Sequence, residues 1–283
     1  MTPLAGRFLA AGLILALAAC EGAVADKKDP LGSSVIDAAQ INDLLLAAGD
    51  PNESIAYFEQ ALAQEPNRAD FRRGLAQSMA RAKRYPEAGR LYEEMIALKQ
   101  DEPADKLDFA MVSAHLQKWD EVERQLTTIP PGLNTPRRHM VEALLEDHRQ
   151  NWAAADAAYA RAESLTTNPA SVLNNWGVSQ MSRGDLPRAQ TTFERALTYN
   201  SRLFSAKNNL AISRGLQGNF QLPVVPMSEK EKAIIMNNLG LIALRKGEKN
   251  IAKGLFAAAV ETHPQHYAAA ADRLAALEAV VEN

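Results

Sequence analysis

The sequence predicts an all-α protein, a right-handed α-α superhelix (a solenoid) of about seven helix pairs followed by a closing helix. Two observations lead to this prediction. A pattern of small and bulky residues recurs at intervals of 33 or 34 residues along much of the chain, which is typical of stacked helix pairs. In addition, only 6% of the 283 residues are aromatic although 47% are hydrophobic. A hydrophobic chain that is poor in aromatic residues favours closely packed helices over a β-sandwich.

Residues 1–19 have the composition of an export signal. Arg7 is their one charged residue, and the stretch from Phe8 to Ala19 is apolar, with Gly12 as its only interruption. At about 1.5 Å per residue this run is roughly 18 Å long, which is shorter than the roughly 30 Å hydrocarbon core of a bilayer. We therefore expect a cleaved signal peptide rather than a membrane-spanning helix.

The signal ends in Leu17-Ala18-Ala19-Cys20, and Cys20 is the single cysteine of the chain. This ending resembles the bacterial lipoprotein signal, which implies that Cys20 is lipidated. The alternative is ordinary cleavage after an Ala-x-Ala motif, with an unrelated cysteine nearby. Glu21 follows, rather than the aspartate that resembles an inner-membrane retention signal, so we expect the periplasmic face of the outer membrane. Residues 20–34 lack periodicity and are expected to form a flexible tether.

The repeated pattern consists of a small residue, a bulky residue four positions later and a small or apolar residue three positions after that. The first copy is Ser54-x3-Phe58-x2-Ala61. Small residues let two helices approach closely, and the bulky residue on the same face fills the space to the next pair. Later copies begin at Ala88, Val122, Ala155, Ala189 and Ala252. Twelve positions before the six copies lie Asn42, Ala76, Ala110, Ala143, Gly177 and Gly240.

This pattern resembles the tetratricopeptide repeat, whose units are helix pairs, and the resemblance extends over residues 35–266. It implies one solenoid domain over residues 35–283, which ends in a closing helix at residues 267–281. The units are expected at residues 35–68, 69–102, 103–135, 136–169, 170–203, 204–232 and 233–266.

The unit at residues 204–232 is irregular. Leu222-Pro223-Val224-Val225-Pro226 occupies the place where its second helix should begin. Two prolines three positions apart are incompatible with a helix interior, so we expect an extended segment that leaves an apolar flank of a neighbouring unit less covered. Ser228 and Glu231 then have the spacing of a capping box and predict the start of a new helix.

The sequence contains no recognisable catalytic or cofactor site. The single cysteine excludes a Cys-based zinc site, and the five histidines lack the spacing of metal ligands with a neighbouring acid. There is no phosphate-binding glycine-rich loop and no Gly-x-Ser-x-Gly motif. The formal net charge of −3 offers no basic surface for nucleic acid. We therefore expect a protein that is not an enzyme and that binds no cofactor or metal; an enzyme with an unrecognised site remains the alternative.

Three asparagine pairs lie at equivalent positions in first helices, at residues 174–175, 208–209 and 237–238. Because asparagine is a poor helix former, these pairs need a reason. The second asparagine of each pair resembles a structural repeat position that bonds to a neighbouring backbone. The first asparagine and the apolar residue four positions later are expected on the concave face, where amides can pair with the backbone of a peptide or helix. The predicted partner-binding residues are Asn174, Val178, Asn208, Ile212, Asn237 and Leu241.

Three stretches between residues 206 and 266 resemble the TadD-type lipoproteins of the tight-adherence (Flp) pilus. They are Asn208-Asn209-Leu210-Ala211, Leu222-Pro223-Val224-Val225-Pro226-Met227 and Glu261-Thr262-His263-Pro264-Gln265-His266. The resemblance implies a lipid-anchored scaffold that assists assembly or localisation of the outer-membrane secretin by binding a peptide segment of the secretin or of another pilus-assembly protein. The alternative is a different periplasmic adaptor lipoprotein, for β-barrel assembly or for cell-wall hydrolases.

Overall fold

The computed structural model describes residues 42, 45–46 and 49–279, and within these residues it contains thirteen α-helices and no strand. The predicted all-α fold class is therefore confirmed. The predicted signal peptide, Cys20 and the tether lie outside the described residues. Among the described helices, none is both long enough and apolar enough to span a membrane. The helices are α2 (Pro51–Gln64), α3 (Ala69–Arg81), α4 (Tyr85–Ala97), α5 (Pro103–His115), α6 (Trp119–Thr128), α7 (Pro136–His148), α8 (Trp152–Ser164), α9 (Ala170–Ser182), α10 (Leu186–Tyr199), α11 (Phe204–Leu216), α12 (Glu229–Arg245), α13 (Lys249–Thr262) and α14 (Ala268–Ala279).

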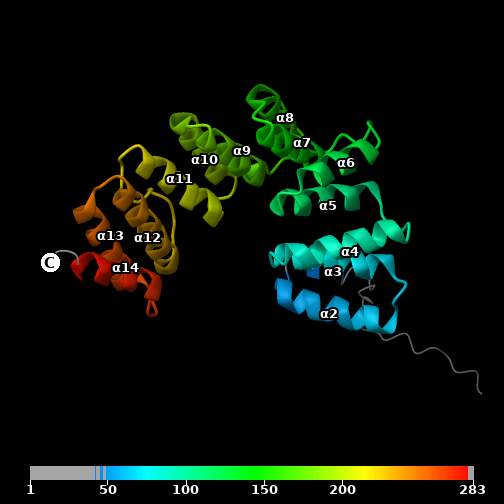
Figure 1. Cartoon of the computed structure of the whole chain (residues 1–283), viewed down its shortest axis with the longest axis horizontal. Coiled ribbons are helices and arrows are strands. Elements are labelled where there is room, and N and C mark those ends of the chain that lie inside the picture. Colours follow the sequence, from blue (N-terminus) through cyan, green and yellow to red (C-terminus); the bar gives the residue numbers. More distant parts are fainter. Residues whose placement is uncertain (1–41, 43–44, 47–48, 280–283) are drawn as a thin grey trace, which may run out of the picture. The chain divides into compact units, whose positions relative to one another are not determined.

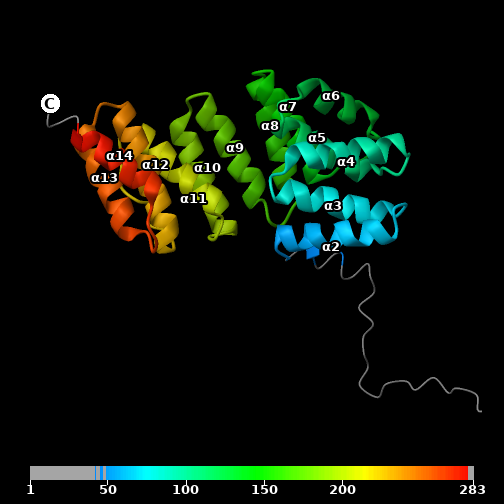
Figure 2. The same cartoon turned by 60° about the horizontal axis from the view of Figure 1, so that its bottom comes forward.

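From α2 to α14, each helix packs against the next one in the chain (Figures 1 and 2). The expected units from residue 69 to residue 203 each contain two helices, α3–α4, α5–α6, α7–α8 and α9–α10. The first helices of neighbouring pairs also contact one another, α5 with α3 and α7, and α11 with α9. Side chains from the first helices of successive pairs can therefore line a common surface.

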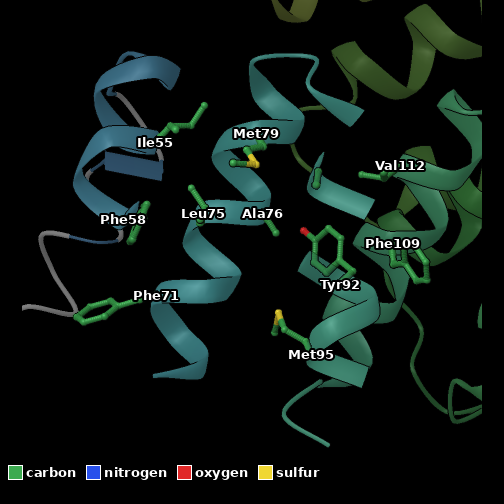
Figure 3. Close-up of a cluster of buried hydrophobic side chains, with 11 residues drawn as sticks. Ile55, Phe58, Phe71, Leu75, Ala76, Met79, Tyr92, Met95, Phe109 and Val112 are labelled. Atoms are coloured by element: carbon green, nitrogen blue, oxygen red, sulfur yellow. The ribbon is translucent and has the colours of Figure 1, made fainter. Parts of the chain in front are cut away.

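Small residues lie where the helices cross, as the repeat pattern predicts. A Cβ atom placed on Gly177 would lie 2.5 Å from Cε1 of Phe193, and one placed on Gly240 would lie 2.6 Å from Cε1 of Phe256. Both phenylalanines are fully buried. The same interleaving forms the cluster between α2 and α5, in which Phe58 and Tyr92 lie on opposite sides of α3 (Figure 3). Gly177 and Gly240 thus set how closely α9 packs on α10 and α12 packs on α13.

No helix forms between α11 and α12, in agreement with the expectation from the two prolines. Ser228 and Glu231 form the capping box at the start of α12, with the backbone N–H of Glu231 donating to Ser228 Oγ at 3.2 Å. Val224 is fully exposed, and beside it lies a hollow of about 420 Å³ that Leu197 and Leu210 also line. The extended segment therefore covers its neighbours incompletely, since it is narrower than a helix.

The buried side chain of Lys207 connects α11 to the first turn of α12. Its ammonium donates to both carboxylate oxygens of Glu231, at 3.1 and 3.2 Å, and the side chain is only 4% exposed. Although burial opposes ionisation, hydrogen bonds from Ser228 and Lys207 lower the pKa of Glu231 below its ordinary value. This ion pair holds α12 against α11 where the second helix of a pair is missing.

Candidate partner-binding groove

A groove of about 620 Å³ crosses the first helices of four consecutive pairs, α3, α5, α7 and α9. We call it the α3–α9 groove. It is formed by side chains that these helices present on one surface, together with Leu46, two tyrosines of α4 and the segment that precedes α9. From the four first helices it is lined by Gln77, Ala80, Arg81, Asp108, Met111, Val112, His115, Pro136, Arg137, Met140, Ser171, Val172 and Asn175.

The apolar part of the groove combines adaptable and fixed side chains. Met111 from α5 and Met140 from α7 lie among its lining residues, together with Val112 and Val172. Methionine is unbranched and polarisable, so it adapts to side chains of different shape. Val112, Met140 and Val172 are almost completely buried and form a fixed base, whereas Met111 is only partly buried. An apolar surface with a few fixed polar groups is the usual character of a ligand-binding site, and segments of other proteins bind in apolar grooves of this kind.

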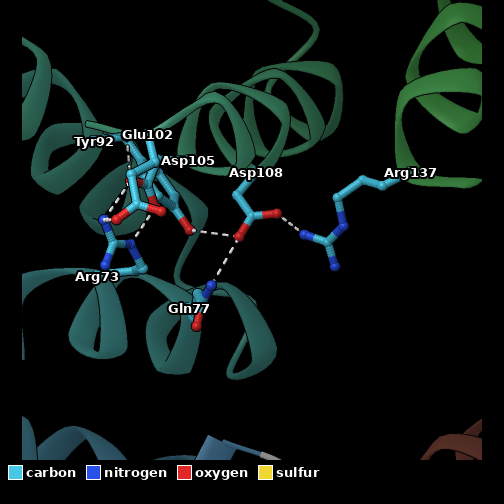
Figure 4. Close-up of polar contacts among 7 residues, drawn as sticks. All are labelled: Arg73, Gln77, Tyr92, Glu102, Asp105, Asp108 and Arg137. Atoms are coloured by element: carbon cyan, nitrogen blue, oxygen red, sulfur yellow. Dashed lines mark hydrogen bonds and ion pairs between the residues drawn. The ribbon is translucent and has the colours of Figure 1, made fainter. Parts of the chain in front are cut away.

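One polar cluster at the edge of the groove joins α3 to α5. Arg73 donates from Nε and Nη2 to the two carboxylate oxygens of Asp105, at 2.7 and 2.9 Å, and from Nη2 to Glu102 at 3.0 Å (Figure 4). Asp105 is 2% exposed, and it also accepts the backbone N–H of Glu102 at 2.8 Å, which caps α5. Hydrogen bonding to Asp105 raises the pKa of Arg73 further above its ordinary value. The cluster fixes the spacing of the first two helices of the groove.

A second polar cluster lies within the groove and is centred on the buried carboxylate of Asp108. Gln77 of α3 donates to its Oδ2 at 2.9 Å, and the hydroxyl of Tyr92 donates to the same oxygen at 3.5 Å. Arg137 of α7 forms an ion pair with Oδ1, so α3, α4, α5 and α7 meet at one carboxylate (Figure 4). Burial raises the pKa of Tyr92 well above its ordinary value, which keeps its hydroxyl protonated as a donor.

His115 is the last residue of α5 and lies about two turns after Asp108. Its ring stacks on Tyr85, with ring centroids 4.3 Å apart and an interplanar angle of 9°. Burial and the nearby charge of Lys83 lower the pKa of His115. The imidazole is therefore neutral at neutral pH, and it adds an aromatic edge rather than a positive charge to the groove.

The residues that sequence analysis selected for partner binding lie outside the lining of this groove. Val178 is exposed, whereas Ile212 and Leu241 are half-buried and pack against hydrophobic clusters of α11–α13. Asn237 is only 5% exposed. No contact in the described part of the chain tests whether they bind a partner, so this remains a prediction.

The structure brings the asparagine pairs together as a ladder along the first helices. Asn209 donates to the carbonyl oxygen of Asn174 at 3.1 Å, and Asn238 donates to that of Asn208 at 2.7 Å. At the end of the ladder, Arg273 of α14 donates to Asn237 at 3.0 Å. Asn209 and Asn238 thus bond to asparagine side chains of the preceding unit. The sequence had instead predicted a bond to a neighbouring backbone.

Replacing Asn174, Asn208 and Asn237 together with alanine is expected to lower the free energy of unfolding by roughly 1–4 kcal/mol, because each loses a hydrogen bond between neighbouring helices. Thermal unfolding followed by circular dichroism measures the change. A triple variant with the melting temperature of the wild type would show that the ladder is not stabilising.

The position of a residue within its repeat indicates part of the lining of the groove. Gln77 and Met111 follow the small residues Ala76 and Ala110 directly, as Val178 follows Gly177. The predicted binding position therefore does line the groove, but in earlier units of the chain. Asp108 and Arg137 could not be paired from the sequence, because they lie in different repeats and at different positions within them.

The described residues contain no group of three or more His, Cys, Asp or Glu side chains that could hold a metal ion. The titratable side chains of the groove are mostly engaged in the contacts between helices described above. The lining residues of the groove can bind a segment of another molecule by apolar contacts and hydrogen bonds.

Comparisons with known proteins agree with this architecture. A family model for the tetratricopeptide repeat matches residues 45–107. The fold resembles a chain in the crystal structure of the APC/C hetero-tetramer Cut9-Hcn1, with a TM-score of 0.56, 16% identity and coverage of 83% of this chain and 48% of that one. It also resembles a tetratricopeptide repeat protein from Parabacteroides merdae ATCC 43184, with a TM-score of 0.51, 14% identity and coverage of 84% and 96%. The chain thus spans about half the length of the first of these. No curated protein matches it.

The protein is therefore an α-α solenoid of the tetratricopeptide-repeat type. Solenoids of this type typically serve as scaffolds for protein–protein interaction without catalysis of their own.

Proposed function

We propose that the protein is a lipid-anchored periplasmic adaptor that binds a segment of a partner protein in the α3–α9 groove. The observation that carries the proposal is the groove itself, where four first helices contribute methionines, buried valines and fixed amides to one surface. Such a surface fits an extended peptide or a helix, because the partly buried Met111 adapts to its side chains and the amides pair with its backbone.

The proposed partner is the outer-membrane secretin of a Flp pilus, and the proposed location is the periplasmic face of the outer membrane. Support comes from the sequence, in the lipoprotein-like ending at Cys20 and the TadD-like stretches between residues 206 and 266. The protein holds a secretin segment near the membrane while the secretin assembles.

The test uses the mature chain carrying Cys20→Ser and overlapping labelled peptides that cover the periplasmic part and C-terminus of the secretin. Fluorescence anisotropy should find one contiguous segment that binds the wild-type groove. The variant Met111→Ala/Met140→Ala should weaken its binding by roughly tenfold or more, since two apolar contacts are lost. A control variant with Val224→Ala, outside the groove, should bind normally. Secretin peptides that do not bind, or that bind both variants equally, would contradict the proposal.

Replacing Cys20 with serine in the full chain is expected to release the protein from the membrane fraction without unfolding it. Acyl chains on this cysteine would contribute about 0.8 kcal/mol for each buried CH₂ group, and the serine variant lacks them. Fractionation of cells followed by immunoblotting measures the distribution, and circular dichroism checks the fold. If the Cys20→Ser protein stayed in the outer membrane, anchoring by lipid would be the wrong explanation.

A further inference from the structure

We infer that the segment accepted by the α3–α9 groove carries an internal aspartate or glutamate side chain that pairs with Arg137, flanked by apolar residues that contact Met111 and Met140. This inference rests on the proposed function and specifies the chemistry of the partner.

Asp108 fixes one side of the Arg137 guanidinium by an ion pair, while the other side faces the groove. Asp108 pairs with the Nη1 group of Arg137 and is itself held by Gln77 and Tyr92 (Figure 4). The Arg137 side chain is nevertheless 57% exposed, whereas that of Asp108 is 9% exposed. No group in the described part of the chain accepts a hydrogen bond from Nε or Nη2 of Arg137. This edge can therefore donate two parallel hydrogen bonds to a second carboxylate, and its geometry is already ordered.

The charge of the groove complements an acidic segment. Among its lining residues the cations are Arg81 and Arg137, and the one carboxylate, Asp108, is buried against Arg137. Arg81 directs its guanidinium to the backbone oxygens of Leu45 and Gly49, so its charge stays at the edge of the groove. The whole chain has a formal charge of −3. The groove is thus locally positive on a negatively charged protein, which favours a partner segment with carboxylates.

The position of Arg137 distinguishes a side-chain carboxylate from a chain terminus. Arg137 lies on α7, and the groove continues past it on both sides, to Gln77 and Arg81 of α3 and to Ser171 and Asn175 of α9. A segment that fills the groove therefore passes Arg137 with residues before and after the contact. The acid is consequently internal to the bound segment.

The test selects short random peptides, displayed on phage, against the mature chain carrying Cys20→Ser. One selected peptide is then synthesised with its acid intact and with the acid replaced by the matching amide. Anisotropy should show that the acidic peptide binds roughly tenfold more tightly, because a charge-assisted pair is lost in the amide. This preference should disappear with Arg137→Gln and persist with Arg188→Gln, an exposed arginine on α10.

A second variant controls for misfolding caused by the unpaired charge of Asp108. Arg137→Gln leaves Asp108 buried without its cation, so Arg137→Gln/Asp108→Asn, which removes both charges, is measured beside it and should also lose the acid preference. Selected peptides that bind in the groove, as judged by Met111→Ala/Met140→Ala, but without an acid preference would overturn this inference alone. A preference that survived both Arg137 variants would overturn it as well. If neither the selected peptides nor the secretin peptides depended on the groove, the proposed function would fail too.

Discussion

Replacing Gly177 with leucine is expected to lower the free energy of unfolding by roughly 1–3 kcal/mol, the usual cost of overpacking a core. Even the Cβ atom of the new residue would lie 2.5 Å from Cε1 and 2.7 Å from Cδ1 of Phe193, which is fully buried. The ring cannot withdraw because it packs among Leu173 and Leu210 in one cluster. The helices α9 and α10 must then move apart, and contacts with neighbouring pairs weaken with them.

Thermal unfolding measures this loss, and the melting temperature should fall by about 2–4 °C for each kcal/mol in a chain of this size. The matched control is Gly254→Leu, in the middle of α13, where no atom lies within 4 Å of an added Cβ. Because leucine is the better helix former, the control should melt at or above the wild-type temperature. An unchanged melting temperature for Gly177→Leu would show that this glycine does not limit the approach of the two helices.

Replacing Arg73 with methionine is expected to cost roughly 2–3 kcal/mol, somewhat less than the roughly 3–5 kcal/mol typical of a fully buried pair. The side chain of Asp105 is 2% exposed and would lose both hydrogen bonds from the guanidinium, while Arg73 itself is 23% exposed. The penalty comes from the carboxylate that remains buried without a cation. Denaturant unfolding measures it.

A double variant separates this penalty from lost packing. Arg73→Met/Asp105→Asn should recover much of the stability, since the amide oxygen of asparagine can still accept the backbone N–H of Glu102 while the buried charge is gone. As a control, Arg84→Met breaks a more exposed pair between the N-cap residue of α4 and Glu87 in its first turn, and should change stability little. Equal losses for Arg73→Met and Arg84→Met, without recovery in the double variant, would contradict a buried ion pair.

The helices could be read from the sequence because their signals are local. Small residues such as Gly177 and bulky residues such as Phe193 recur at fixed spacing, and the stacking of helix pairs follows from that spacing. The interruption at Pro223 and Pro226 was equally readable, since proline excludes a helix interior whatever surrounds it. The predicted binding residues were chosen for the unusual asparagine pairs, which the structure shows bonded to one another; their binding of a partner stays a prediction.

The sequence by itself therefore determined the all-α class, the helix crossings and the extended segment before α12, because each depends on spacing within one or two helices. Only the tertiary structure decided where the α3–α9 groove lies and which charges it presents. The contact of Arg137 with Asp108, and of Asp108 with Gln77, joins residues about one repeat apart in sequence. Such contacts depend on the distance and rotation between neighbouring helix pairs, which the summed packing of many side chains sets and no single repeat encodes.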